Sequence, residues 1–250
     1  MMHRLKKLAV SALIAAAAAV ISPAPAGRAN ADEMTPIMGE AVLTESQMLR
    51  YLDSVYPDAP DVVKTLPAIY LEEGELEGVR GDIAFAQACL ETGNFIFPSS
   101  TAVRLEQWNF AGLGVTENGM TGNEFASPRE GVRAQIQHLK AYTTDEPLAS
   151  ECVDQRFSLV KRGCAKYVEL LGIQENPEGL GWAAGEDYGP HVLAWYDRIA
   201  AFESDEEESA AEQEGPAAEE EKSDDNTEEE KEEAIDITEV LRSFFIPCPR

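Results

Sequence analysis

The chain has 250 residues and a formal net charge of -26 at pH 7. Much of this charge lies in residues 203–233, where 17 acidic residues accompany only two lysines. Residues 32–202 contain 27 acidic and 12 basic residues, so they offer no basic stripe, and nucleic acid is excluded as a partner.

The first 31 residues have the organisation of a secretory signal peptide. A basic start at residues 4–7 precedes an apolar stretch at residues 8–21, and Ala29-Asn30-Ala31 provides a small-residue cleavage site. The apolar stretch is shorter than the roughly 20 residues that a membrane-spanning helix needs. We therefore expect signal cleavage, no stable membrane span afterwards, and a secreted or cell-wall-associated protein. Residues 32–43 form a leader without clear periodicity.

Apolar residues at helical spacing predict one mostly helical domain of about 160 residues, at residues 44–202. Capping boxes open two of its helices, at Thr44 to Gln47 and at Ser127 to Glu130. The segment from Asp82 to Thr92 is almost wholly apolar and is predicted to be a buried helix. Helices are expected at residues 44–55, 61–75, 82–92, 127–142, 156–160, 164–171 and 190–202.

One region predicts strand structure. Within a polar, glycine-rich and aromatic stretch at residues 95–125, Gly112 to Val115 and the pair Asn118-Gly119 are typical of a short β-hairpin with a tight turn. The predicted fold class is therefore α+β, mostly α, with a small β-hairpin lobe.

Four cysteines remain after signal cleavage, which leaves three complete pairings open. We favour a disulfide between Cys152 and Cys164, because export permits disulfides and this pair closes a short loop. Cys89 lies in the apolar helix and is expected to be a buried free thiol. Cys248 either pairs with Cys89 or stays free.

The acidic residues 203–233 cannot bury apolar surface and are expected to be disordered. Residues 234–250 form a short amphipathic segment. It either docks on the domain or on a partner that the sequence does not identify, or it is a marginal helix without a stable contact.

Glu91 ends the apolar helix, where a protonated carboxyl is favoured over an unpaired charged one. Such a group is suited to act as the general acid of a glycosidase, the role that a glutamate with a raised pKa has in lysozyme. The alternative is a structural glutamate paired with an arginine such as Arg80 or Arg104.

Six motifs follow one another in order between residues 43 and 202: Gly81 to Gly93, Trp108 to Gly114, Gly131 to Tyr142, Arg162 to Cys164, Gly181 to Ala183 and Tyr188-Gly189. Together they resemble the bacterial peptidoglycan glucosaminidases, glycoside hydrolase family 73. The resemblance implies a lysozyme-like α+β fold and hydrolysis of the β-1,4 bond after N-acetylglucosamine in the peptidoglycan glycan strand.

Roles follow from the resemblance by position. Glu91 matches the catalytic acid, Asn109 an asparagine that lines the glycan cleft, and Tyr188 a tyrosine that faces the reacting sugar. The family's second carboxylate lies on the hairpin, where this chain offers Glu117 and Glu124. If one of them activates water, the carboxyl groups should be about 6.5–9.5 Å apart and the reaction inverting. Alternatively, the N-acetyl oxygen of the substrate attacks the anomeric carbon.

Aromatic and glycine residues in the loops complete the predicted substrate site: Trp108, Phe110, Gly112 and Trp182 join Asn109. We predict no metal and no cofactor, because His138 and His191 are isolated and no ligand spacing is present. Two other functions stay open. One is a muramidase or lytic transglycosylase on the same fold, and the other is a cell-wall-binding protein without turnover.

Overall fold

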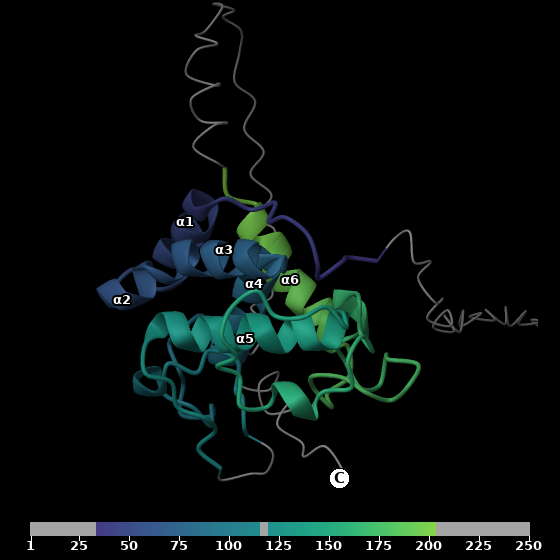
Figure 1. Cartoon of the computed structure of the whole chain (residues 1–250). Coiled ribbons are helices and arrows are strands. Elements are labelled where there is room, and N and C mark those ends of the chain that lie inside the picture. The colour runs from purple at the N-terminus through teal and green to yellow at the C-terminus, as the bar shows by residue number, and fades with distance from the viewer. Residues whose placement is uncertain (1–33, 116–119, 204–250) are drawn as a thin grey trace, which may run out of the picture. The chain divides into compact units, whose positions relative to one another are not determined.

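The computed structural model describes residues 34–115 and 120–203 (Figure 1). Within these ranges, no helix combines the length and the apolar character needed to cross a membrane. Several predictions lie outside the described residues: the signal peptide at 1–31, the acidic stretch from residue 204 onward, the segment 234–250, Cys248, Glu117 and the Asn118-Gly119 turn.

The described chain is mostly helical, as its periodicity predicts. The capping box at Thr44 is confirmed: the Thr44 hydroxyl accepts from the Gln47 N–H, and the Gln47 side chain accepts from the Thr44 N–H. At Ser127 the N-cap half of the predicted box is found, in which the Ser127 hydroxyl accepts from the Glu130 N–H. The α-helices are α1 (Glu45–Val55), α2 (Asp61–Lys64), α3 (Leu66–Glu77), α4 (Gly81–Thr92), α5 (Pro128–Thr143) and α6 (Tyr188–Ala200). Short 3-10 turns are η2 (Leu105–Gln107), η3 (Phe157–Leu159) and η4 (Val168–Leu170).

The single helix expected at residues 61–75 is divided into α2 and α3 at Thr65. Pro67 lies in the first turn of α3 and has no N–H to continue the hydrogen bonding of a preceding turn. The Thr65 hydroxyl instead donates to the carbonyl oxygen of Val62, at 2.7 Å, and ends α2. Proline therefore lies in the first turn of a new helix, where its missing N–H is tolerated.

The predicted β-hairpin lobe is wrong for the described residues, in which only isolated bridges are found. One backbone bond, from Asn123 N–H to Leu113 oxygen at 2.7 Å, joins the two arms. The Asn109 amide then donates to the carbonyl oxygens of Leu113, at 2.8 Å, and Asn123, at 3.0 Å. The Asn109 side chain therefore holds the two arms together in place of a strand ladder. The alternation of apolar residues in the sequence does not predict such side-chain bonds.

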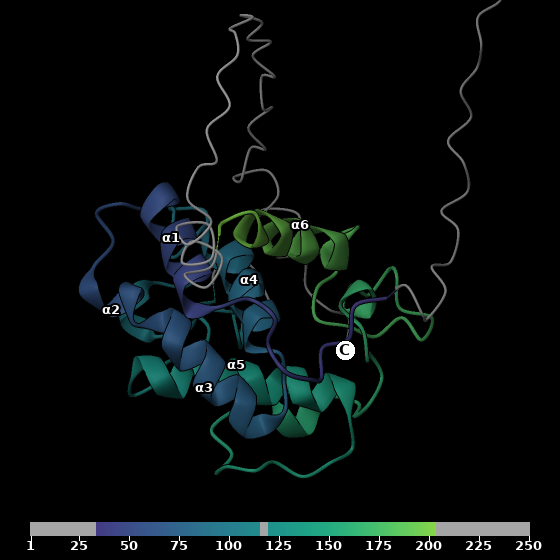
Figure 2. The ribbon, with the colours of Figure 1, turned by 90° about the horizontal axis from the view of Figure 1, so that it is seen from above.

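Helix α4 lies at the centre of the helices, between α6 on one side and α3 and α5 on the other (Figure 2). All of its residues are buried. Its first residue, Gly81, lies directly against α3: a Cβ atom there would be 2.2 Å from the carbonyl oxygen of Tyr70. Glycine is required at this contact, and it lets α4 pass through the core with its C-terminal Glu91 inside the protein.

The predicted disulfide is not formed: Cys152 and Cys164 are both free thiols, as is the buried Cys89. The segments of the first two cysteines are tethered to different parts of the fold. Gln137 of α5 donates to the carbonyl oxygen that precedes Cys152, at 2.8 Å. Asn176 donates to the carbonyl oxygen of Cys164, at 2.9 Å. The prediction relied on the short sequence separation of the two cysteines, which does not show that their segments are bound to different residues.

Candidate active site

The chain reverses sharply just after Glu91. Gly93, Asn94 and Phe95 have φ angles of 61°, 60° and 61°, so three consecutive residues adopt the left-handed conformation. For residues other than glycine this costs on the order of 1–3 kcal/mol each, and the surrounding structure must stabilise it. The turn therefore fixes the end of α4, and with it the backbone of Glu91, at an energetic cost.

Buried hydrogen bonds stabilise this turn. The Asn94 side-chain oxygen accepts from the Tyr51 hydroxyl, at 2.8 Å, and from the Trp195 indole N–H, at 3.0 Å. The Thr92 hydroxyl accepts from the Phe95 N–H, at 2.8 Å, and donates back to a helix carbonyl. Helices α1, α4 and α6 thus meet at the residues that follow Glu91 and hold its position.

The Glu91 carboxyl is almost completely buried, with 5% of the residue exposed. The Tyr188 hydroxyl donates to its Oε1 at 2.5 Å. Burial raises the pKa of Glu91 to about 7, and hydrogen bonds from Tyr188 and Trp182 oppose the rise. The carboxyl is therefore substantially protonated near neutral pH, which is the state that a general acid requires.

Tyr188 begins α6 and is fully buried beside the acid. Its hydroxyl accepts from the Gln87 side-chain N–H, at 2.8 Å, and donates to Glu91. Burial and the neighbouring carboxyl hold the pKa of Tyr188 well above its ordinary value, so the hydroxyl keeps its proton. The structure places Tyr188 on the core side of Glu91, as a donor to the acid.

Trp182 lies against a second group of polar and aromatic residues. Its ring is 4.9 Å from the His138 ring in edge-to-face geometry and 6.0 Å from the Tyr142 ring. His138 is bonded through Nδ1 to Asp154 at 2.7 Å, and Tyr142 donates to the carbonyl oxygen that precedes Trp182. These contacts fix the indole of Trp182, which acts to lower the pKa of Glu91.

Asn109 and Phe110, which were predicted to contact the substrate, are both buried. Asn109 is inaccessible, and its side-chain oxygen accepts from the backbone N–H groups of Ala111 and Leu113 while its amide binds two carbonyls. No hydrogen-bonding capacity of the Asn109 side chain is left for a sugar. Phe110 is 1% exposed and contacts the Phe95 ring. Both residues shape the loop beside the site.

The remaining predicted site residues have different surroundings. Trp108 has a φ of 51° and is half-buried, and Gly112 has a φ of 62° and is also half-buried. Glu124 is exposed, and Glu117 lies outside the described residues. The structure therefore brings together Glu91, Tyr188 and Trp182, whereas the second carboxylate stays a prediction.

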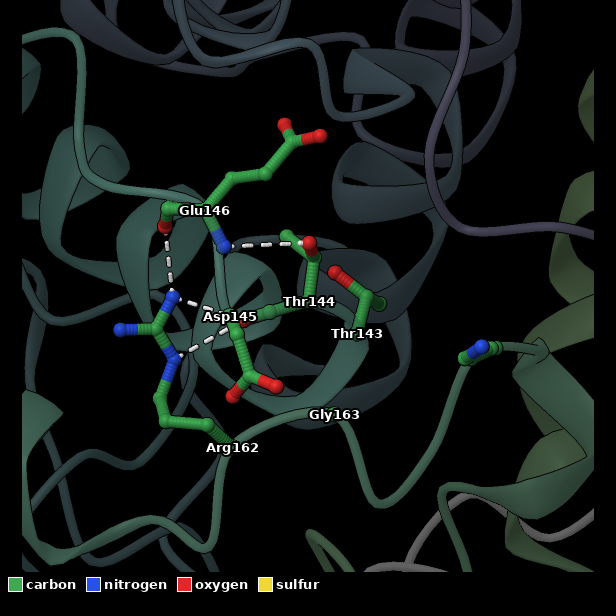
Figure 3. Close-up of a pocket in the computed structure, with 7 residues that line it drawn as sticks. Thr143, Thr144, Asp145, Glu146, Arg162 and Gly163 are labelled. Atoms are coloured by element: carbon green, nitrogen blue, oxygen red, sulfur yellow. Dashed lines mark hydrogen bonds between the residues drawn. The ribbon is translucent and has the colours of Figure 1, made fainter.

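A polar hollow of about 530 Å³ lies at the C-terminal end of α5 (Figure 3). The Arg162 guanidinium donates to the carbonyl oxygens of Thr144 and Glu146, so backbone groups already hold it. None of the residues around Glu91 lines the hollow, and we assign it no part in the reaction. The lining residues are Thr143, Thr144, Asp145, Glu146, Arg162, Gly163 and Lys166.

Sequence reasoning did not assign two residues near the acid to the site. Gln87 is a polar residue inside the apolar run of α4, one turn before Glu91, and that contrast is the signal that could have identified it. His138 has no second histidine at ligand spacing, so the sequence favours a structural role for it. Its position against Trp182 depends on the packing of α5, which no local pattern predicts.

Residues 67–206, more than half of the chain, match the sequence model of the family described as Mannosyl-glycoprotein endo-beta-N-acetylglucosaminidase. A Borreliella burgdorferi relative, described as an uncharacterized protein, is 43% identical over 127 residues, which are 50% of this chain and 61% of the relative. The chain thus spans less than two thirds of that relative. A solved structure of S. aureus Autolysin E in complex with the muropeptide NAM-L-ALA-D-iGLU is similar, with 14% identity and a TM-score of 0.46 over 66% of this chain and 70% of that chain.

Proposed function

Because the chain belongs to the glucosaminidase family, we propose that it is an exported hydrolase of peptidoglycan. It cleaves the β-1,4 glycosidic bond after N-acetylglucosamine, with Glu91 as the general acid. The observation that carries this proposal is a carboxyl at the end of a wholly buried helix, with a pKa of about 7 and a tyrosine hydroxyl that donates to one of its oxygens.

The reaction needs a proton on the leaving oxygen as the glycosidic bond breaks. Protonated Glu91 supplies it from the oxygen that Tyr188 does not bind. Positive charge then develops at the anomeric carbon. Either Glu124 or Glu117 activates a water molecule against that carbon, or the N-acetyl oxygen of the substrate attacks it and water opens the ring that forms.

The products of digestion test the proposed bond. Purified chain is incubated with peptidoglycan, and the soluble fragments are analysed by mass spectrometry after reduction. We expect fragments with N-acetylglucosamine at the reducing end. Reducing N-acetylmuramic acid would instead identify a muramidase, and an anhydro product a lytic transglycosylase. Release of no fragments beyond those of a buffer control would contradict an enzymatic function.

The hydrogen bond from Tyr188 leads to a prediction about pH. Glu91 acts while protonated, so kcat/KM should fall about tenfold per pH unit well above pH 7. In the Tyr188→Phe variant the carboxylate loses a donor that stabilises its charge, so its pKa should rise by about 0.5–1 unit. The alkaline limb of a plot of kcat/KM against pH should move to higher pH.

The matched control for this prediction is Tyr196→Phe. Tyr196 lies on the same helix, and its hydroxyl accepts from Arg80, at 2.9 Å. Its removal should leave the alkaline limb of the pH profile in place. An unchanged limb in Tyr188→Phe, or an equal movement in both variants, would show that Tyr188 does not set the pKa of the acid.

A further inference from the structure

Gln87 connects the acid and its tyrosine to the interior of the protein. It lies on α4, one turn before Glu91, and is inaccessible to solvent. Its Nε2 donates to the Tyr188 hydroxyl oxygen, at 2.8 Å, and its Oε1 accepts from Gln135 Nε2, also at 2.8 Å. A buried glutamine with both ends bonded is held in one orientation.

The hydrogen bonds continue from Gln135 to α3. Gln135 lies on α5 and is 1% exposed, and its Oε1 accepts from the Tyr70 hydroxyl at 2.6 Å. Its Nε2 has a second acceptor, the backbone carbonyl oxygen of Ala84, at 2.9 Å. Tyr70 is fully buried as well. Residues from four helices thus form one buried chain of hydrogen bonds that ends at Glu91.

A backbone carbonyl oxygen of α4 determines which group donates in each of these hydrogen bonds. A carbonyl oxygen can only accept, so the bond to Ala84 requires that Gln135 present its nitrogen on that side. The same nitrogen meets Gln87 Oε1, and Gln87 must therefore present its own nitrogen to Tyr188. Since the Tyr188 oxygen receives this N–H, its single proton is directed to Glu91 Oε1.

We propose that Gln87, Gln135 and Tyr70 are positioning residues that hold Tyr188 as a donor to Glu91, so that the transferable proton of the acid stays on Oε2. This inference rests on the proposed role of Glu91 as the general acid. Without an N–H on its oxygen, the Tyr188 hydroxyl can rotate and accept the proton of protonated Glu91. The acid proton would then be bound on the core side, away from the glycosidic oxygen.

The other groups around the Glu91 carboxyl do not determine the direction of its hydrogen bond with Tyr188. The indole N–H of Trp182, which acts to lower the pKa of Glu91, can only donate and cannot accept the acid proton. Tyr142 and His138 of α5 contact the Trp182 ring. Of the groups named, Tyr188 is the one that both contacts Glu91 and could reverse its hydrogen bond. Control of its hydroxyl therefore decides which oxygen of the acid carries the proton.

The test compares Gln87→Met with the wild-type chain, alone and in the Tyr188→Phe background. Methionine has a similar length and cannot donate to Tyr188. We expect kcat to fall about fivefold, the effect of one hydrogen bond, with KM changed less than about twofold and the alkaline limb moved to higher pH. In the Tyr188→Phe background the same substitution should have no further effect on kcat or on the limb, because its action passes through that hydroxyl.

Gln47→Met is the control for the general effect of losing a buried glutamine. Gln47 caps α1 and bonds to the carbonyl oxygen of Phe202, at 2.8 Å. It should lower the Tm without moving the pH profile. If Gln87→Met does not fold, Tyr70→Phe removes one oxygen from the far end of the chain, and we expect a smaller change, about twofold, in the same direction.

A readout without turnover separates this inference from the proposed function. The pKa of Glu91 is measured in the free protein by ¹³C NMR of labelled glutamate, with Glu91→Gln to identify the signal. Gln87→Met should raise that pKa even if no substrate is cleaved. An inactive wild-type chain would refute the proposed function alone. A folded Gln87→Met with unchanged kcat and unchanged Glu91 pKa, or with equal effects in the Tyr188→Phe background, would overturn the inference.

Discussion

Replacing Glu91 with glutamine is expected to lower kcat on peptidoglycan by about 10²–10⁴-fold, the contribution of a well-placed general acid. Glutamine has nearly the same shape, and its side-chain oxygen can still accept from the Tyr188 hydroxyl. It cannot release a proton to the glycosidic oxygen. The measurement is the initial rate at which purified wild-type and variant chains release soluble fragments from peptidoglycan.

The control for this substitution is Glu178→Gln. Glu178 forms an exposed ion pair with Lys161, and neither residue contacts the site in the described structure. Its change should leave the rate within about twofold, as an exposed pair contributes little. Equal, measurable rates for wild type and Glu91→Gln would show that Glu91 is not the acid. Binding to peptidoglycan with no turnover in either chain would support the wall-binding alternative.

The same substitution has an expected effect on stability. The folded protein holds the pKa of Glu91 at about 7, above its ordinary value of 4.5. Between these two values the folded state binds the proton more tightly than the unfolded state, so stability falls as pH rises from about 4.5 through 7. Glutamine does not titrate, so the Glu91→Gln variant does not lose stability in this way as pH rises. Its Tm should therefore exceed that of the wild type more at pH 8 than at pH 5, as measured by thermal unfolding.

The second large effect is expected at Glu77, where the change to glutamine should lower the free energy of unfolding by about 3–5 kcal/mol. The Glu77 side chain is inaccessible and pairs with the Lys140 ammonium, at 2.8 Å, whose side chain is 5% exposed. Glu77 also accepts from the backbone N–H groups of Ala149 and Ser150. Neutralising it leaves a buried charge without its partner. Urea denaturation measures the loss.

Two comparisons make the Glu77 prediction specific. Asp53→Asn breaks an exposed pair with Lys64 and should change the free energy of unfolding by no more than about 1 kcal/mol. The double change Glu77→Leu with Lys140→Met removes both charges and should be less destabilising than Glu77→Gln. If Glu77→Gln is no worse than Asp53→Asn, the buried pair does not stabilise the fold.

Acid should weaken the Glu77 contacts in the wild type. Burial acts to raise the pKa of Glu77, but hydrogen bonds from Lys140, Ser150 and Ala149 outweigh it and hold the pKa below its ordinary value. A depressed folded-state pKa stabilises the protein above the unfolded-state pKa, and this stabilisation is lost as pH falls. The difference in stability between wild type and Glu77→Gln should therefore narrow at acid pH.

Local signals in the sequence were sufficient for most helices. The caps at Thr44 and Ser127 satisfy backbone donors within one turn of their own residues, so they could be identified without tertiary contacts. The apolar run that precedes Glu91 predicted both burial and a raised pKa, because nearly every neighbour in that helix is apolar. The burial of the Glu91 carboxyl and the direction of its pKa shift were thus predictable from its own helix, whereas the helix alone left a structural role open.

Only the tertiary structure decided what surrounds that acid. Gln87 forms hydrogen bonds with Gln135, which is 48 residues away in the sequence, and with Tyr188, which is 101 residues away. The Asn109 side chain forms hydrogen bonds within its own loop, where strand pairing was predicted. Such bonds depend on how helices meet, and periodicity reports only which face of a helix is buried. By itself, the sequence determined most of the helices and the carboxyl at the end of one of them. The packing of α3, α4, α5 and α6 determined which groups surround that carboxyl.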